Sequence, residues 1–209
     1  MTAPVKQPSS PSDIQSDHFG MERLIFFSDA VFSIAVTLLA LEIRLPTDKS
    51  SLGNDELLQM LLALWPKYLA YVLSFLIVGS FWLGHHRRFH FIKRYDSRLI
   101  FLNLVLLMVI AFIPFPTAVI SEHGNQTATI FYALTMAVTG LLSTGIWVYA
   151  AHNHRLIDPD LPAHTIRRDT LRQLAVPAVF LLSVGLAFIN YDLAKYSWIL
   201  VAPAVLLIR

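Results

Sequence analysis

Six stretches of mostly apolar residues divide the chain. A helix that crosses a bilayer needs about 20 predominantly apolar residues, and five stretches approach or exceed that length while the last is shorter. They cover residues 23–45, 57–84, 99–121, 128–151, 173–190 and 194–209. The pattern predicts an all-α integral membrane protein with six transmembrane helices.

Prolines modify two of these helices and the start of a third. Pro177 and Pro203 lie inside the fifth and sixth stretches, where we expect each to kink its helix. Pro66 and Lys67 fall near the start of the second stretch. We therefore expect its first turns to lie in the outer headgroup region and the span proper to begin near Tyr68.

The chain divides into a tail and one membrane domain. Residues 1–20 are polar and rich in proline and serine, and they lack the apolar core of a cleavable signal. We predict a disordered N-terminal tail over residues 1–20 and a six-helix transmembrane domain over residues 21–209.

Basic residues are distributed unevenly between the two sides of the predicted bundle. Of the 16 Lys and Arg residues, 12 lie before the first span, in the second and fourth loops, or at the chain end, and four lie on the opposite side. Cytoplasmic loops carry the excess of Lys and Arg. Both termini are therefore predicted to be cytoplasmic, in agreement with an even number of spans.

Composition supports the membrane class and narrows the chemistry. The chain is 56% hydrophobic and 14% charged, whereas soluble domains carry roughly 25% charged residues. A net charge of +2 is too small to indicate nucleic-acid binding, and the absence of cysteine excludes thiolate chemistry. No HExxH, GxSxG or glycine-rich phosphate loop is present, so we predict neither an enzyme nor a cofactor.

A short histidine cluster, His85, His86 and His90, raises the possibility of zinc binding. Neither a carboxylate nor a cysteine completes the ligand set, and the neighbouring arginines would repel a cation. We interpret the stretch as a basic loop beside anionic lipid headgroups, with no metal site.

The first span, RLIFFSDAVFSIAVTLLALEI, carries Asp29 near its cytoplasmic end. An ionised carboxylate at such a depth costs several kcal/mol unless it is paired, so Asp29 needs a partner. Antiparallel neighbours reach the same depth at FWLGHH in the second span and RLIFLN in the third. The residues at this depth are Ser28, Trp82, His85, His86 and Asn103. They predict an intramembrane polar network, in which either histidine could contact Asp29.

A second face of the same helix is apolar. At about 100° per residue, Ile34, Leu38 and Leu41 form one stripe, and Asp29 points about 140° away from it. Ser33 and Thr37 flank the stripe, and such hydroxyls usually bond back to a helix carbonyl. A stripe of this kind is more often core or lipid-facing than pore-lining. The periodicity alone therefore does not show whether this stripe lines a pore.

Three motifs are similar to those of a known family. Arg23, Phe27, Ser28 and Asp29 form RxxxFSD at the start of the first span, FWLGHHRRF ends the second, and NLVLLMVIAFIPFPTA fills the third. Over residues 20–120 the chain thus resembles the endolysosomal potassium channels and their bacterial homologues. Gly84 departs from the pattern, which has a polar residue such as asparagine there.

The resemblance implies a homotetramer in the bacterial inner membrane whose first helices line a central pore permeable to K⁺, without a TVGYG filter. It implies an apolar constriction at Ile34, Leu38 and Leu41 and ion-selective hydroxyls at Thr37 and Ser33. The signature residues Arg23, Phe27, Ser28 and Asp29 would be structural. The expected function is a cation channel with modest preference for potassium over sodium.

Two other functions are compatible with the residues. Asp29 beside histidines could form the proton relay of a proton-coupled secondary transporter. A non-conducting membrane scaffold would use Asp29 only to hold its helices together.

Overall fold

The computed structural model describes the backbone of residues 11–45 and 53–201, and the side chains of residues 19–45 and 53–201. Apart from one isolated bridge between Ile92 and Ile157, the regular structure in these ranges is helical. The α-helices are α1 (Pro11–Leu41), α2 (Asn54–Ala63), α3 (Trp65–Phe91), α4 (Ser97–Phe112), α5 (Pro114–His123), α6 (Gln126–Ala151), α7 (Ala163–Ala187) and α8 (Tyr191–Ser197). Two 3₁₀ turns, η1 (His152–His154) and η2 (Trp198–Leu200), follow α6 and α8.

Five helical segments of the described chain are long and apolar enough to cross a membrane. They are Phe19–Leu41, Trp65–Phe91, Ser97–His123, Gln126–His154 and Ala163–Ala187. The third segment consists of α4 and α5, which meet at Ile113 just before Pro114. The first five predicted spans therefore correspond to helices in the structure, with shifted boundaries.

The predicted sixth span, residues 194–209, is described only in its first part. Tyr191–Ser197 form the short helix α8, and the 3₁₀ turn Trp198–Leu200 follows it. Residues 202–209, which include Pro203, lie outside the described residues. A sixth crossing and the kink at Pro203 thus stay predictions.

Several helices begin or end at residues that the hydropathy pattern did not indicate. Helix α1 begins at Pro11, inside the predicted tail, of which only residues 1–10 lie outside the described residues. Proline suits the first helical position, because its φ is already helical and its missing N–H would have no partner there. The predicted second span is divided at Leu64 into α2 and α3, and α3 continues to Phe91.

Helix α7 begins at Ala163, whereas the hydropathy pattern placed the fifth span at residues 173–190. Its first turns are basic and polar, so an apolar window does not detect them. They are held by the bond from Thr170 Oγ1 to the carbonyl of Ile166 and by the bond from Gln173 Nε2 to Asp169 Oδ2. Pro177 lies inside the helix, as predicted.

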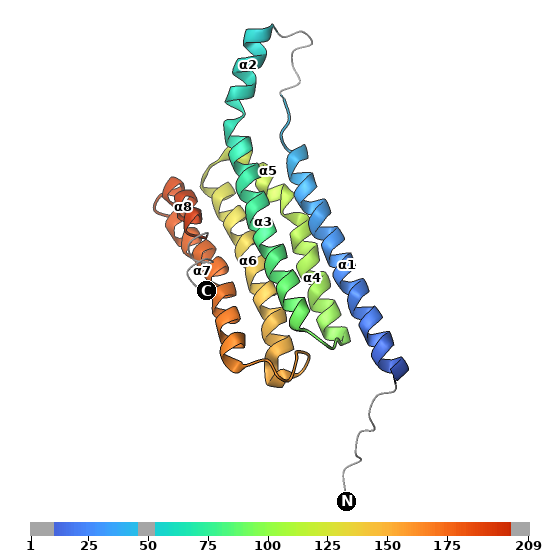
Figure 1. Ribbon diagram of the computed structural model, residues 1–209. Helices are drawn as coiled ribbons and strands as arrows, with labels where there is room; N and C mark the ends of the chain where they lie inside the picture. The colour runs from blue at the N-terminus through green and yellow to red at the C-terminus, as the bar shows by residue number, and fades with distance from the viewer. Residues whose placement is uncertain (1–10, 46–52, 202–209) are drawn as a thin grey trace, which may run out of the picture.

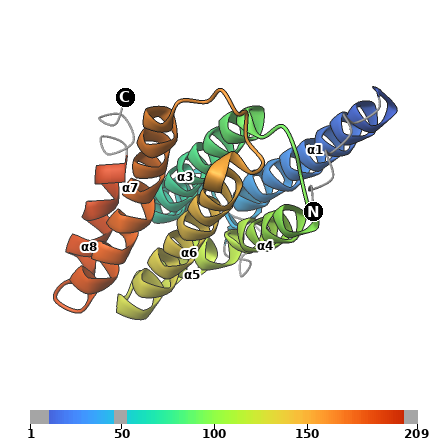
Figure 2. The ribbon, with the colours of Figure 1, turned by 90° about the horizontal axis from the view of Figure 1, so that it is seen from below.

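Helix α6 occupies the centre of the bundle. It packs against α4 and α5 on one side and against α7 and α8 on the other (Figure 1). Helix α1 lies at the opposite edge from α7 and α8 and contacts α3, α4 and α5 (Figure 2). One long side of α1 is therefore left uncovered by the other described helices.

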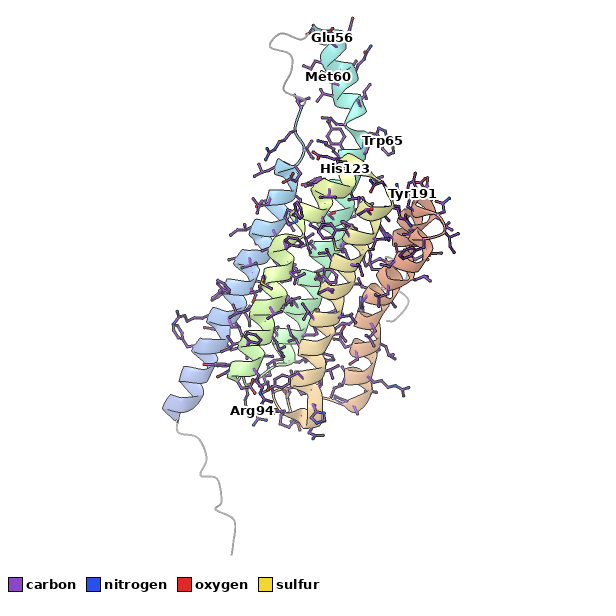
Figure 3. The ribbon with its side chains drawn as sticks, turned by 180° about the vertical axis from the view of Figure 1, so that it is seen from behind. Glu56, Met60, Trp65, Arg94, His123 and Tyr191 are labelled. Carbon is purple, nitrogen blue, oxygen red and sulfur yellow. The ribbon has the colours of Figure 1, made fainter. Side chains whose placement is uncertain are left out.

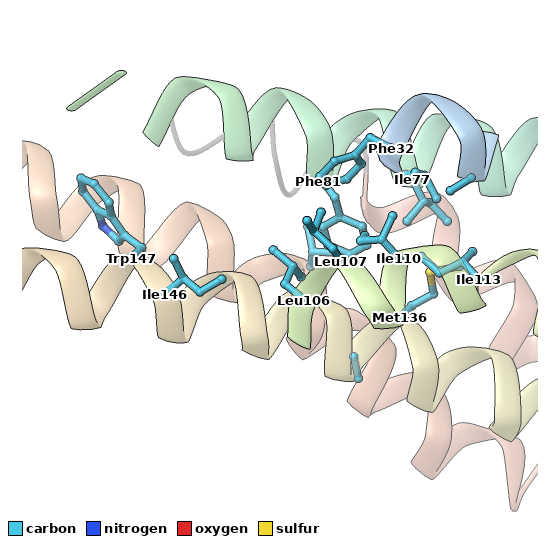
Figure 4. Packing of buried hydrophobic residues seen from close by; sticks show 14 of the residues in the cluster. Phe32, Ile77, Phe81, Leu106, Leu107, Ile110, Ile113, Met136, Ile146 and Trp147 are labelled. Atoms are coloured by element: carbon cyan, nitrogen blue, oxygen red, sulfur yellow. The ribbon is translucent and has the colours of Figure 1, made fainter. Parts of the chain in front are cut away.

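The apolar core lies where α1, α3, α4 and α6 approach one another. Phe32 of α1 meets Ile77 and Phe81 of α3, with Leu107 and Ile110 of α4 beneath them (Figure 4). All five side chains are buried. The buried residues of α1 thus fix the rotation of this helix about its own axis.

Close packing of α6 against α7 depends on small residues. A Cβ added at Gly140 of α6 would lie 2.8 Å from Cδ of Pro177 in α7. In membranes, small residues at helix interfaces let two backbones approach closely. Gly140 therefore sets the separation of the two helices at this level.

The two ends of the bundle differ in charge. The loop after α3 carries Lys93 and Arg94, and the loop after η1 carries Arg155 at the same end. Figure 3 shows Arg94 at this end, with His123 and Tyr191 at the other. We call the first the basic end and the second the outer end.

Candidate functional site

Helix α1 has two faces with different environments. Met21, Ser28, Phe32, Ala35 and Leu39 are buried against the bundle. The residues exposed on the other face recur every three or four positions: Arg23, Phe26, Phe27, Ala30, Ser33, Ile34, Thr37, Leu38, Leu41 and Arg44. This exposed stripe is uncovered along the full length of the span.

The three predicted constriction residues all lie on the exposed stripe. Ile34 is 58% exposed, Leu38 38% and Leu41 59%. Leucine and isoleucine with this exposure are left open by the described part of the chain, so they are available to lipid or to a neighbouring chain. The structure thus brings the three side chains onto one surface, as the helical periodicity predicted.

The hydroxyls of Ser33 and Thr37 both donate to backbone carbonyls of their own helix. Ser33 Oγ lies 2.8 Å from the carbonyl oxygen of Asp29, and Thr37 Oγ1 lies 2.8 Å from that of Ile34. Both side chains are exposed. Since a hydroxyl has one proton and two lone pairs, each oxygen keeps acceptor capacity toward whatever lies beside this face.

The hydrogen-bond partner of Asp29 is Trp82 on α3. Nε1 of Trp82 donates a hydrogen bond of 2.8 Å to Oδ1 of Asp29. A hydrogen bond to a charged acceptor is stronger than one between neutral groups. The indole, and neither of the two histidines considered from the sequence, therefore makes the contact with the carboxylate.

A second set of hydrogen bonds joins three helices one layer deeper. Nε2 of His85 on α3 donates to Oδ1 of Asn103 on α4 over 2.9 Å. Nδ2 of Asn103 donates to Oγ of Ser28 over 2.9 Å, and Ser28 donates to the carbonyl of Leu24 over 2.8 Å. Ser28, His85 and Asn103 are all buried. The predicted network thus exists in two parts, Trp82 with Asp29 and His85 with Asn103 and Ser28.

The other predicted network residues lie apart from these bonds. Arg23 and Phe27 are on the exposed stripe of α1, and Phe27 is 51% exposed. His86 is exposed, and its ring centroid lies 5.6 Å from that of Trp82. The structure therefore places Arg23 and Phe27 with the candidate pore residues, and it places His86 beside the network.

His85 is held by aromatic rings as well as by Asn103. Its ring stacks on Phe89 with centroids 4.1 Å apart and lies 5.6 Å from that of Phe32. Its Nδ1 is buried and has no hydrogen-bond partner among the described residues. Because Oδ1 of Asn103 can only accept, Nε2 of His85 carries the hydrogen of this bond.

The sequence suggested that Arg88 belongs to a surface loop, and this was wrong. Its side chain points into the bundle. Because α3 continues to Phe91, Arg88 lies on the helix, is only 5% exposed, and donates from Nη2 to Oγ of Ser143 over 2.7 Å. A small cavity beside it, about 60 Å³, is also lined by Asp169 of α7. A Cβ at Gly84 would lie 3.3 Å from Nη2 of Arg88. The glycine that departs from the family pattern thus leaves room for this guanidinium.

Asp96 ties the two loops of the basic end together. Its Oδ1 accepts from the backbone N–H of Leu99 over 2.8 Å and caps α4, and its Oδ2 accepts from Tyr149 Oη over 2.6 Å and from Arg155 over 3.0 Å. Partial desolvation raises the pKa of Asp96, but the bonds from Tyr149 and Leu99 and the charge of Arg155 outweigh it, so that the pKa lies below its ordinary value. No sequence motif indicated this contact, because the partners are more than 50 residues apart.

Two of the four tryptophans, Trp147 and Trp198, are buried. Trp147 donates to Oγ1 of Thr170 over 3.1 Å, and Trp198 donates to Oγ of Ser183 over 2.7 Å. The two indoles are 1% and 7% exposed. Their position near helix ends reflects contacts between helices, since an N–H buried at membrane depth needs an acceptor.

Taken together, the fold and the site define a multi-span membrane protein whose first helix is bonded to its own bundle on one face and uncovered on the other. A sequence profile of the family described as "Endosomal/lysosomal potassium channel TMEM175" matches residues 23–114. A relative from Streptomyces collinus, described as a potassium channel, is 38% identical over 82% of this chain and 84% of its own length.

A solved structure and a further relative also place the chain in this family. The crystal structure of a lysosomal potassium-selective channel TMEM175 homolog from Chamaesiphon minutus superposes with a TM-score of 0.79 and 31% identity, covering 91% of this chain and 98% of that one. A relative from Danio rerio, described as an endosomal/lysosomal proton channel, is 31% identical over 72% of this chain but only 28% of its own length. The chain belongs to the TMEM175 family of potassium channels, and it is an ion channel, not an enzyme.

Proposed function

We propose that the chain assembles as a homotetramer around a potassium-selective pore lined by the exposed stripe of α1. Ile34, Leu38 and Leu41 form the apolar constriction, and Thr37 and Ser33 supply hydroxyl oxygens beside it. The observation that carries the proposal is the exposure of this stripe together with the attachment of the opposite face of α1 to α3 and α4 by hydrogen bonds.

Several copies of the chain are needed for such a pore. One chain contributes one α1, and the exposed stripe of that helix faces away from its own bundle. Four copies related by a rotation axis would place four stripes around a common path. Closed rotational symmetry is the usual way in which identical chains bury a shared surface.

The mechanism follows from side-chain chemistry at the constriction. Rings of Ile34, Leu38 and Leu41 narrow the path, so that a hydrated cation sheds part of its water shell. The hydroxyl oxygen of Thr37, and that of Ser33 below it, replaces part of the lost coordination, because each proton is already donated to a backbone carbonyl. Potassium loses water at a smaller free-energy cost than sodium, so it passes more readily. Selectivity is modest, since hydroxyl rings lack the dense carbonyl cage of a filter loop.

The Asp29 and Asn103 bonds have a structural role in this proposal. They fix the rotation of α1 and therefore the direction in which Ile34 and Leu38 point. The protein lies in the cell membrane, the inner membrane in a bacterium, with its basic end and both termini in the cytoplasm. The excess of Lys and Arg at that end supports this orientation.

The test is a reversal-potential measurement on purified protein in planar bilayers with potassium on one side and sodium on the other. Wild type is expected to give a potential that favours potassium, and Thr37→Ala is expected to shift it toward zero. Thr127→Ala, at the outer start of α6 and away from α1, is the matched control. Unchanged potentials in Thr37→Ala would contradict the assignment of selectivity. A pH gradient across the same bilayers measures whether protons also pass.

A further inference from the structure

Helix α2 carries an apolar face that nothing in the described chain covers. None of its residues is buried. Leu58 and Leu62 are 57% and 66% exposed, and Leu57 and Leu61 are 37% and 39% exposed. The helix stands beyond the outer end of the bundle, above Trp65, with Glu56 and Met60 near its tip (Figures 1 and 3).

The leucines of α2 follow a helix-packing pattern. Leu58 and Leu61 lie at i and i+3 on α2 and form a seam, and Trp65, the first residue of α3, follows beyond the break at Leu64. Leu57 and Leu62 widen this seam on its two sides, as in the helices of bundles. Glu56 and Ala63 fall on the far side of the helix, about 140° and about 160° from Leu61. We call Leu57, Leu58, Leu61, Leu62 and Trp65 the outer leucine face.

Helix lengths place most of this face outside the bilayer. At about 1.5 Å per residue, the 27 residues of α3 extend about 40 Å. A bilayer is about 40–45 Å thick including its headgroups, and a typical tilt of about 20° shortens a helix very little. Helix α3 alone therefore crosses the membrane, and the 10 residues of α2 add about 15 Å beyond it.

An ion pair near the start of α3 marks the outer surface. Nζ of Lys67 lies 3.5 Å from Oε1 of Glu122 at the end of α5. Charged groups at this position belong to the headgroup layer, which is roughly 5–8 Å thick on each side. Leu61 and Leu58 lie six and nine residues before Lys67, or about 9 and 13 Å further out. Lipid tails do not reach these side chains.

No other described residue buries the outer leucine face. The segment that connects α1 to α2, PTDKSSL at residues 46–52, is polar except for Pro46 and Leu52. Identical chains in a membrane assembly, by contrast, hold their α2 helices at the same height. In such an assembly, the α2 helix of a neighbouring copy therefore offers an apolar surface at the same height as the outer leucine face.

We infer that the outer leucine face of α2 packs against a second copy of this chain, outside the membrane and above the candidate pore. The inference rests on the assembly of the proposed function and adds to it a contact separate from α1. The contact joins subunits at the outer surface, so it holds the outer ends of the pore-lining helices together.

Photochemical cross-linking tests the inference. The natural chain contains no cysteine, so Leu61→Cys gives a single site for benzophenone maleimide. Ala63→Cys is the matched control, because it lies two residues away on the opposite side of α2. The labelled proteins are reconstituted in liposomes, irradiated, and separated on denaturing gels. Leu61→Cys is expected to give several times more covalent chain dimer than Ala63→Cys, and Leu58→Cys, about one turn further out, is expected to behave like Leu61→Cys.

Equal dimer yields from Leu61→Cys and Ala63→Cys would overturn the inference, as would labels that attach only to lipid or within one chain. Potassium flux from the same liposomes separates this failure from that of the proposed function. Flux without preferential cross-linking would refute the α2 contact and leave the channel assignment standing. Preferential cross-linking without flux would support the α2 contact and count against the proposed pore.

Discussion

The indole Nε1 of Trp82 lies 2.8 Å from Oδ1 of Asp29, and this hydrogen bond joins α3 to α1. Asp29 points about 140° away from the stripe of Ile34, Leu38 and Leu41. The bond therefore determines which side of α1 is turned outward. Asp29 thus contributes to the direction in which the exposed stripe of α1 faces, without lying on that stripe.

Loss of the Trp82 bond is expected to weaken the attachment of α1. Trp82→Phe removes the donor and keeps an aromatic ring, and hydrogen bonds between membrane helices contribute about 0.5–1.5 kcal/mol. We expect a lower unfolding temperature in detergent. Asp29→Asn keeps an acceptor for the indole and should lose less. The neighbouring Leu83→Ala, which alters an exposed side chain, is the control; an equal loss in that variant would argue against a specific role of the bond.

Truncation of the constriction is expected to raise conductance. Leu38→Ala removes most of an apolar side chain from the exposed stripe of α1 and widens the proposed path. Single-channel current in symmetrical potassium measures the effect. Phe101→Ala on α4, 65% exposed and outside the stripe of α1, gives the comparison for another exposed apolar residue. Equal currents in wild type and in Leu38→Ala and Leu41→Ala would place the narrow part of the path elsewhere.

Gly140 is expected to tolerate no larger side chain without a loss of stability. The Cβ of Gly140→Ala would lie 2.8 Å from Cδ of Pro177, whose ring cannot rotate away. Overpacking of this kind costs about 1–3 kcal/mol. Gly145→Ala, on the same helix with nothing within 4 Å of the added Cβ, is the control. It should be neutral or slightly stabilising, because alanine favours helix more than glycine does. Thermal unfolding of the two variants side by side decides the point.

The contacts of Asp96 predict a pH dependence of stability at the basic end. Its pKa lies below the ordinary value of 3.8, because the bonds from Tyr149 and Leu99 and the charge of Arg155 outweigh the desolvation that raises it. A carboxylate with a lowered folded-state pKa stabilises the fold above its unfolded pKa, and this contribution is lost as pH falls through the folded-state pKa. The unfolding temperature of Asp96→Asn should thus lie below that of wild type by a constant amount between about pH 5 and 8.

Below about pH 4 the difference between wild type and Asp96→Asn should shrink progressively, since Asp96 of the unfolded chain then binds a proton, and the folded carboxylate binds one only at still lower pH. Asp160 is an exposed acid in the loop between η1 and α7. Asp160→Asn controls for the general effect of removing a negative charge. A difference that persists unchanged at the lowest pH would show that the charge of Asp96 contributes nothing.

Much of the fold and of the candidate site follows from the sequence. Five spans were predicted in the correct order, because hydropathy and proline positions are properties of each segment alone. The stripe of Ile34, Leu38 and Leu41 follows from the fixed rotation of about 100° per residue. Asn103 and Trp82 were placed near Asp29 because antiparallel helices of known length bring known depths together.

The tertiary structure alone decided which groups meet. From depth we expected a histidine, His85 or His86, to contact Asp29, and this was wrong, because the rotation of α3 about its axis places Trp82 there. The same rotation turns Arg88 toward Ser143, whereas the sequence placed it at the lipid surface. The contact of Asp96 with Tyr149 and Arg155 depends on how two loops fold back on each other. Sequence periodicity fixes the faces of one helix, but the angle between two helices is set by the packing of all their side chains.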